Sequence, residues 1–74
     1  MKKYEVSWGL GYDNKHVKYF ENFNAMTFFV SCRSAQNWSF LEVYDLEPKG
    51  DIALVYSESV CFGWNQEYLD QNNT

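Results

Sequence analysis

The sequence predicts one α+β domain over residues 1–74, in which an antiparallel β-sheet carries one helix on one face, in the order β-β-α-β-β. Three observations lead to this prediction. The chain of 74 residues leaves room for a single core. Segments with a period of two flank a central segment with helical spacing. Six Phe, six Tyr and three Trp supply large apolar surfaces for a small core. We expect three or four strands, with a fifth as an option.

The first two strands are predicted as a hairpin. Polar and apolar residues alternate over residues 3–8, KYEVSW, as in a half-buried strand. Residues 16–20, HVKYF, have the β-branched and aromatic composition of a second strand. Asp13-Asn14 between them is a typical turn pair. If the second strand does not form, the order becomes strand–helix–strand–strand after a long loop.

Two glycines in the segment WGLGYDNKH, residues 8–16, raise the question of a phosphate-binding loop. A dinucleotide-binding fingerprint needs a third glycine where this chain has Asn14, and it needs a helix directly afterwards. A strand-like segment follows instead. We therefore expect Gly9 and Gly11 to shape the backbone of the first strand, at a bulge or where another backbone approaches closely.

A helix is predicted over residues 22–35, NFNAMTFFVSCRSA, where the apolar spacing changes to three and four residues. Asn22 suits the N-cap position because its side-chain oxygen can accept a hydrogen bond from the first turn. Arg33 suits the negative C-terminal end of the helix dipole. The predicted buried face consists of Ala25, Phe28, Phe29, Cys32 and Ala35, widened by Met26 and Val30.

A second hairpin is predicted from residues 38–44, WSFLEVY, and residues 52–57, IALVYS. The turn between them, DLEPKGD, contains the only proline of the chain. The apolar positions that follow either extend the last strand or form a short fifth one: Val60, Phe62 and Trp64. From about Asp70 the chain is polar, and we expect it to be frayed.

The sequence predicts neither export nor a membrane span. Its basic start, MKK, is followed by charged residues and glycines where a signal peptide would be apolar. No apolar run approaches the roughly 18 residues that a spanning helix needs. We therefore expect a cytoplasmic protein in which Cys32 and Cys61 are free, buried thiols.

The sequence offers little material for catalysis or for holding a cofactor. His16 is the only histidine, and the two cysteines are far from it in the sequence, so no zinc-binding set is formed. A nucleophile such as Ser7 needs a base and an orienting group, which no motif supplies. The acids within residues 45–51 are typical of a solvated loop. We expect a non-enzymatic protein that has no cofactor and no metal.

Charge is unevenly distributed along the chain. Residues 1–33 carry five basic and three acidic side chains, whereas residues 34–74 carry one basic and seven acidic ones, and the net charge is −4. An acidic half repels the phosphate backbone of nucleic acids and attracts basic protein surfaces. We therefore expect a protein partner with a basic surface, and neither nucleic acid nor a membrane.

The second predicted hairpin carries large apolar side chains on both faces, although one helix can cover only one of them. We therefore expect an exposed aromatic patch flanked by acids, a composition typical of protein interfaces. The candidate protein-binding residues are Trp38, Phe40, Glu42, Tyr44, Asp45, Glu47, Asp51 and Tyr56. Two alternatives stay open: the segment with Phe62 and Trp64 covers the patch, or the patch is the interface of a symmetric homodimer.

Three segments resemble short acidic proteins of bacteriophages and other mobile elements: YEVSW, FENFNAMTFF and WSFLEVYDLEPKGDIALVY. The chain is similar to anti-CRISPR and related anti-defence proteins in size, acidity and sheet-plus-helix form, over roughly residues 3–57. The resemblance implies a stoichiometric inhibitor that binds a basic surface of a host defence protein and blocks it by occlusion.

Overall fold

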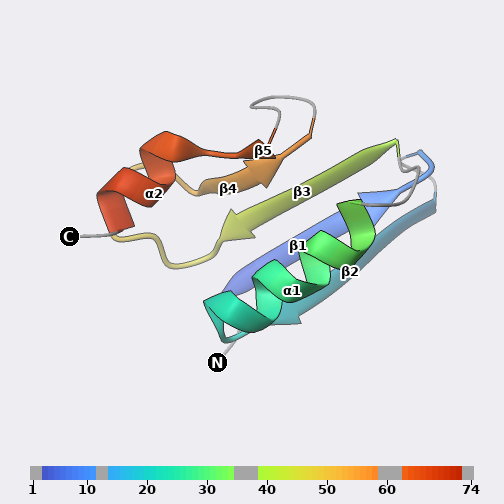
Figure 1. The fold of residues 1–74 in the computed structure, drawn as a ribbon, viewed down its shortest axis with the longest axis horizontal. Helices are drawn as coiled ribbons and strands as arrows, with labels where there is room; N and C mark the ends of the chain where they lie inside the picture. The colour runs from blue at the N-terminus through green and yellow to red at the C-terminus, as the bar shows by residue number, and fades with distance from the viewer. Residues whose placement is uncertain (1–2, 12–13, 35–38, 59–62, 73–74) are drawn as a thin grey trace.

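The computed structural model describes residues 3–11, 14–34, 39–58 and 63–72, which form a five-stranded antiparallel sheet and two helices (Figure 1). The elements in chain order are β1 (Tyr4–Gly9), β2 (Lys15–Phe20), α1 (Phe23–Ser34), β3 (Phe40–Asp45), β4 (Leu54–Ser57), β5 (Gly63–Trp64) and α2 (Gln66–Asn72). The α+β class and the antiparallel sheet are confirmed. The predicted order β-β-α-β-β is incomplete, because β5 and α2 follow β4.

The sheet has the order β2-β1-β3-β4-β5, so that β2 forms one edge. Tyr4 of β1 pairs with Phe20 of β2 on one side and with Asp45 of β3 on the other. Residues directly opposite each other in an antiparallel pair point to the same face of the sheet. The registers therefore assign the residues of β1, β2 and β3 to one face or the other.

One face, which we call the helical face, carries Tyr4, Val6 and Trp8 of β1, and both helices lie on it (Figure 1). Helix α1 packs there through aromatic rings. The centroid of the Phe29 ring lies 5.1 Å from that of Trp8, and the centroid of the Phe23 ring lies 5.7 Å from that of Tyr4. The hydrophobic core lies between this face and the helices.

Helix α1 begins as its sequence predicts. The side-chain Oδ1 of Asn22 accepts hydrogen bonds from the backbone N–H groups of Asn24 and Ala25, at 2.7 and 3.1 Å. These bonds satisfy two of the N–H groups that the first turn leaves without a partner in the helix. Asn22 is therefore the N-cap, as expected.

The buried face of α1 differs from the predicted one. Phe28 is 74% exposed, and Ala25 and Cys32 are exposed too, whereas Met26 and Val30 are buried. The last predicted member, Ala35, lies outside the described residues. Apolar side chains surround most of this helix, so spacing alone does not choose between two overlapping stripes. The partners on the sheet decide, since Phe23 and Phe29 rest on aromatic rings there and bring the stripe of Met26 and Val30 inside.

Helix α2 occupies a polar segment for which the sequence predicts no element. Its buried residue, Tyr68, is 2% exposed. The side-chain Nδ2 of Asn65, just before the helix, donates a hydrogen bond to the carbonyl oxygen of Leu54 at 2.9 Å. This bond ties the start of α2 to β4. Residues 70–72, at the start of the segment expected to be frayed, form the last turn of the helix.

The β1–β2 hairpin confirms that Gly9 is there for the backbone. A Cβ atom added to Gly9 would lie 2.6 Å from the backbone oxygen of Asn14, closer than real Cβ atoms approach other atoms. Gly11 has a φ of +145°, a backbone angle that residues other than glycine rarely adopt. The N–H of Asn14 donates to the carbonyl oxygen of Gly11 at 3.2 Å. Asp13, the other half of the predicted turn pair, lies outside the described residues.

Candidate functional site

The face of the sheet opposite the helices, which we call the open face, carries the alternate residues of the strands. None of the described helical residues lies over it (Figure 1). The registers give two neighbouring cross-strand rows on this face: Tyr19–Glu5–Tyr44 and Val17–Ser7–Glu42.

Large apolar side chains are exposed on the open face. Val17 is 42% exposed, Tyr19 40% and Tyr44 36%, although all three stand in a regular five-stranded sheet. Glu5 and Glu42, each partly buried, lie in the same rows. The open face therefore combines two tyrosines and a valine with two carboxylates, and it carries an exposed ammonium group, that of Lys15, where β2 pairs with Gly9.

Glu5 lies between the two tyrosines in its row. A hydrogen bond with the Glu5 carboxylate, followed by the negative charge of that carboxylate, raises the pKa of Tyr19. The hydroxyl of Tyr19 therefore keeps its proton and stays a donor. Tyrosine joins a large apolar ring to a polar tip, and for this reason it is enriched at protein interfaces.

Away from these residues, several open-face side chains of β1, β3 and β4 are buried. Phe40 is 7% exposed, Ser7 is 3% exposed and Ser57 has no exposed surface. Accessible apolar surface on this face is therefore concentrated around Val17, Tyr19 and Tyr44, towards the first residues of β1.

The structure brings only part of the predicted binding set together. The open face holds Phe40, Glu42 and Tyr44. Glu47 and Asp51 are exposed in the connection between β3 and β4, and Trp38 lies outside the described residues. The remaining two residues, Asp45 and Tyr56, lie on the helical face.

Asp45 is buried, so its expected place on a solvated loop is wrong. It is 2% exposed and closes β3 on the helical face. Its Oδ2 accepts a hydrogen bond from the hydroxyl of Tyr68 at 2.6 Å, and its Oδ1 accepts one from the backbone N–H of Glu47 at 2.8 Å. Both oxygens of the carboxylate therefore accept hydrogen bonds from groups of the protein itself. The sequence does not reveal this, because Tyr68 is 23 residues away.

Tyr56 is buried too, at 7% exposure, and points away from Tyr44. It pairs with Val43, and its ring centroid lies 4.9 Å from that of Trp64 in an edge-on contact. The ring of Trp64 also lies 6.1 Å from that of Phe23 in α1. Trp64 thus packs on the helical face rather than over the open face. Phe62, the other residue expected to cover the patch, lies outside the described residues.

The first hairpin supplies site residues that the sequence analysis did not select. Val17 and Tyr19 come from β2, and Glu5 from β1. A signal was present in HVKYF, since the alternation places Val17 and Tyr19 on the side opposite Phe20. If β2 is a strand, Val17 and Tyr19 lie on the same face of it, and they stay exposed unless another element covers that face.

The groups usually associated with chemistry lie apart from one another. Cys32 is an exposed free thiol on α1, which corrects the expectation of a buried one, and Cys61 lies outside the described residues. The ring of His16 stacks on Trp8, with centroids 5.5 Å apart. Within the described ranges, His, Cys, Asp and Glu side chains form no group of three that could hold a metal ion. Neither described helix is long and apolar enough to cross a membrane.

Comparisons with known proteins gave no match to a family model, to a curated protein or to a solved structure. The function has to be inferred from the residues and their arrangement.

Proposed function

We propose that this chain is a non-enzymatic protein-binding module that docks its open face on a basic surface of a partner protein. The observation that carries this proposal is the exposure of Val17, Tyr19 and Tyr44 on one face of a sheet whose other face holds both helices. Tyrosines on a flat, rigid surface are favourable for binding because two torsions suffice to fix a large ring.

Charge supports a basic partner. The open face has carboxylates at Glu5 and Glu42, and exposed carboxylates follow at Glu47 and Asp51 beyond the end of β3. The chain as a whole carries a net charge of −4. Complementary charge raises the association rate, whereas desolvated aromatic residues at the centre of an interface supply most of the affinity.

The resemblance to phage-encoded anti-defence proteins gives the proposal its class of partner, a host defence protein met in the host cytoplasm. The mechanism is occlusion. A rigid sheet placed on a positively charged groove excludes the substrate or the protein that the groove would otherwise bind. This mechanism needs no catalytic group and one copy of the inhibitor for each target.

The test compares two double variants with the wild type. Tyr19→Ala/Tyr44→Ala removes exposed rings from the open face, and Leu10→Ala/Phe28→Ala removes apolar groups that are even more exposed from elsewhere. A protein captured from a bacterial lysate is purified, and its Kd is measured with each variant. We expect the open-face variant to bind about tenfold to hundredfold more weakly, and the matched control to bind like the wild type.

Equal binding by the wild type and the open-face variant, with both folded, would contradict the proposal. Sedimentation velocity at several concentrations examines the alternative of a homodimer. A dimer that Tyr19→Ala/Tyr44→Ala dissociates would assign the open face to self-association.

A further inference from the structure

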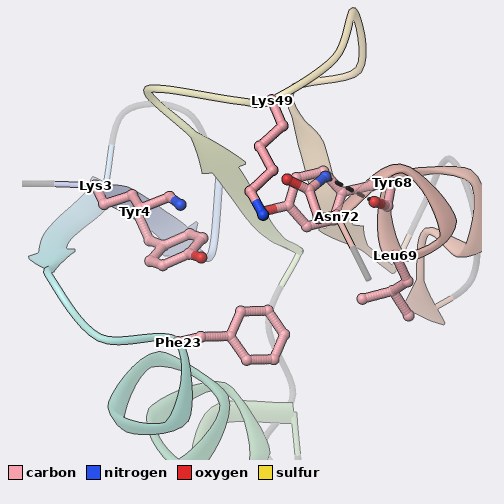
Figure 2. Close-up of a pocket in the computed structure, with 7 residues that line it drawn as sticks. All are labelled: Lys3, Tyr4, Phe23, Lys49, Tyr68, Leu69 and Asn72. Atoms are coloured by element: carbon pink, nitrogen blue, oxygen red, sulfur yellow. Dashed lines mark hydrogen bonds between the residues drawn. The ribbon is translucent and has the colours of Figure 1, made fainter. Parts of the chain in front are cut away.

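A pocket of about 360 Å³ lies on the helical side of the molecule, between the two helices (Figure 2). Its walls come from four parts of the chain: the start of β1, the start of α1, the β3–β4 connection and α2. The lining residues are Lys3, Tyr4, Phe23, Lys49, Tyr68, Leu69 and Asn72. The pocket uses none of the exposed residues of the open face.

The body of the pocket is apolar. Figure 2 shows the rings of Tyr4 and Phe23 across a gap from Tyr68 and Leu69. Tyr4 and Phe23 are already in edge-on contact with each other, with ring centroids 5.7 Å apart. Small-molecule sites are concave, mostly apolar and of roughly 300–1,000 Å³, and they contain a few placed polar groups. This pocket falls at the small end of that range.

Two lysines supply positive charge to the pocket. The Nζ of Lys3 lies 5.4 Å from the centroid of the Tyr4 ring, and the side chain of Lys49 extends towards the pocket from the β3–β4 connection (Figure 2). Lys3 is fixed at its backbone, because its N–H donates to Phe20 and its carbonyl oxygen accepts from Leu46. No carboxylate of the described residues forms an ion pair with either ammonium group, and no acid is among the lining residues.

This concentration of positive charge is unusual for the chain. It carries six basic residues against ten acidic ones, yet two of the six meet at one pocket. One acid bonds to a lining residue: the Oδ2 of Asp45 accepts a hydrogen bond from the hydroxyl of Tyr68. Asp45 is itself 2% exposed and is not among the lining residues, whereas Tyr68 forms part of the wall.

We infer that the pocket binds a small organic acid whose body is aromatic or otherwise apolar. The apolar part lies against Tyr4, Phe23 and Leu69, and the carboxylate lies between the ammonium groups of Lys3 and Lys49. Neutral analogues lack the charge that the two lysines attract, and cationic analogues are repelled. The site is independent of the protein-binding proposal, because it lies on the other face of the sheet.

The test is a titration followed by amide NMR spectra of the full chain, with diphenylacetate as the probe and diphenylacetamide as its neutral counterpart. We expect diphenylacetate to shift the amide signals of Tyr4, Phe23 and Leu69 with a Kd on the order of 1 mM or tighter. The neutral amide is expected to bind at least threefold more weakly.

Lysine substitutions show whether the charge acts in the pocket. Lys3→Met and Lys49→Met keep most of the apolar length of the side chain and remove the charge. Each is expected to weaken diphenylacetate binding by about threefold, and the double variant by about tenfold, with no change for the amide. Lys15→Met is the matched control, since Lys15 is exposed at the far end of β1–β2, where it pairs with Gly9.

Three results would overturn the inference. The first is the absence of shifts at the pocket residues in the wild type. The second is equal affinity for the acid and the amide. The third is a Lys3→Met/Lys49→Met variant that binds diphenylacetate as well as Lys15→Met does. The amide spectrum of each variant shows directly whether that variant is folded, so these results are read only from folded protein.

Discussion

The hydrogen bond from Tyr68 to Asp45 joins two side chains that are each 2% exposed. It connects the last helix of the chain to the end of β3, across 23 residues of sequence. A buried carboxylate that loses a donor has no access to water in compensation, so removing the donor costs more than an average hydrogen bond. This pair therefore holds the C-terminal helix against the sheet.

Replacing Tyr68 by Phe removes the hydroxyl and keeps the ring. We expect Tyr68→Phe to lower the free energy of unfolding by about 1–3 kcal/mol, measured by urea denaturation. The matched control is Tyr19→Phe, which removes an exposed hydroxyl that is also bonded to a carboxylate and should change stability far less. Equal losses in the two variants would show that burial does not strengthen the Tyr68 bond.

Tyr68 also predicts how stability depends on pH. Burial, and after it the hydrogen bond to Asp45, raises the pKa of Tyr68 above its ordinary value of 10.0. Below pH 10 the hydroxyl is protonated in both the folded and the unfolded chain, so its contribution is fully present. Above that value the unfolded chain releases the proton and the folded chain keeps it, so stability falls as the pH rises.

Alkaline unfolding measures this effect. The free energy of unfolding of the wild type is expected to fall more steeply above pH 10 than that of Tyr68→Phe. Both proteins share the other five tyrosines, so the difference between the two curves isolates Tyr68. Parallel curves would mean that Tyr68 ionises alike in the folded and the unfolded chain.

At the scale of elements, helix α1 shows that an apolar helix is placed by its partners. Its Met26 has no exposed surface, whereas Phe28, two residues later, is 74% exposed. We expect Met26→Ala to lower the free energy of unfolding by about 2–5 kcal/mol in urea denaturation, because it opens a cavity in the core. Phe28→Ala should be close to neutral. The reverse order of the two effects would restore the helix face that the sequence spacing indicates.

The β1–β2 hairpin depends on the absence of a side chain at Gly9. An added Cβ would meet backbone atoms of Asn14, which cannot move without opening the turn. We expect Gly9→Ala to destabilise the protein by about 1–3 kcal/mol, seen as a lower thermal midpoint. In Gly50→Ala, the control, the added Cβ would meet only the flexible side chain of Gln71 and should cost little.

At the scale of the whole molecule, the two faces of the sheet differ in what covers them. Both helices lie on one face, and the open face keeps exposed rings beside carboxylates (Figure 1). Long-range attraction to a basic partner is then expected to act on association more than on dissociation. Because the net charge of the chain is −4, this attraction favours positively charged partners.

The dependence of the association rate on ionic strength tests whether charge attracts the partner. For the protein captured by the wild type, we expect the association rate to fall as salt is added, while the dissociation rate changes little. Glu42→Gln should lower the association rate at low salt and have less effect at high salt. A rate independent of salt would contradict electrostatic steering.

The fold could be predicted from the sequence where a pattern is local. The alternation of KYEVSW indicated β1 because its apolar residues share one face, and Asn22 indicated the start of α1. The parts that depend on distant partners were not accessible in this way. Helix α2 is fixed by Tyr68 meeting Asp45, and the burial of Tyr56 depends on Trp64. The candidate site was predicted only in part for the same reason: Tyr44 was identified, whereas the residues that share its face come from the first hairpin, Glu5 from β1 and Val17 and Tyr19 from β2.

The edge position of β2 has a consequence for handling the protein at high concentration. Five of its six residues are exposed, and no described strand pairs with its outer side. Such an edge can template pairing with other chains, and positively charged side chains oppose this by mutual repulsion. Lys15 and Lys18 are placed along that strand. Their repulsion opposes edge-to-edge pairing, and we expect that neutralising both would make the protein associate through this edge at high concentration.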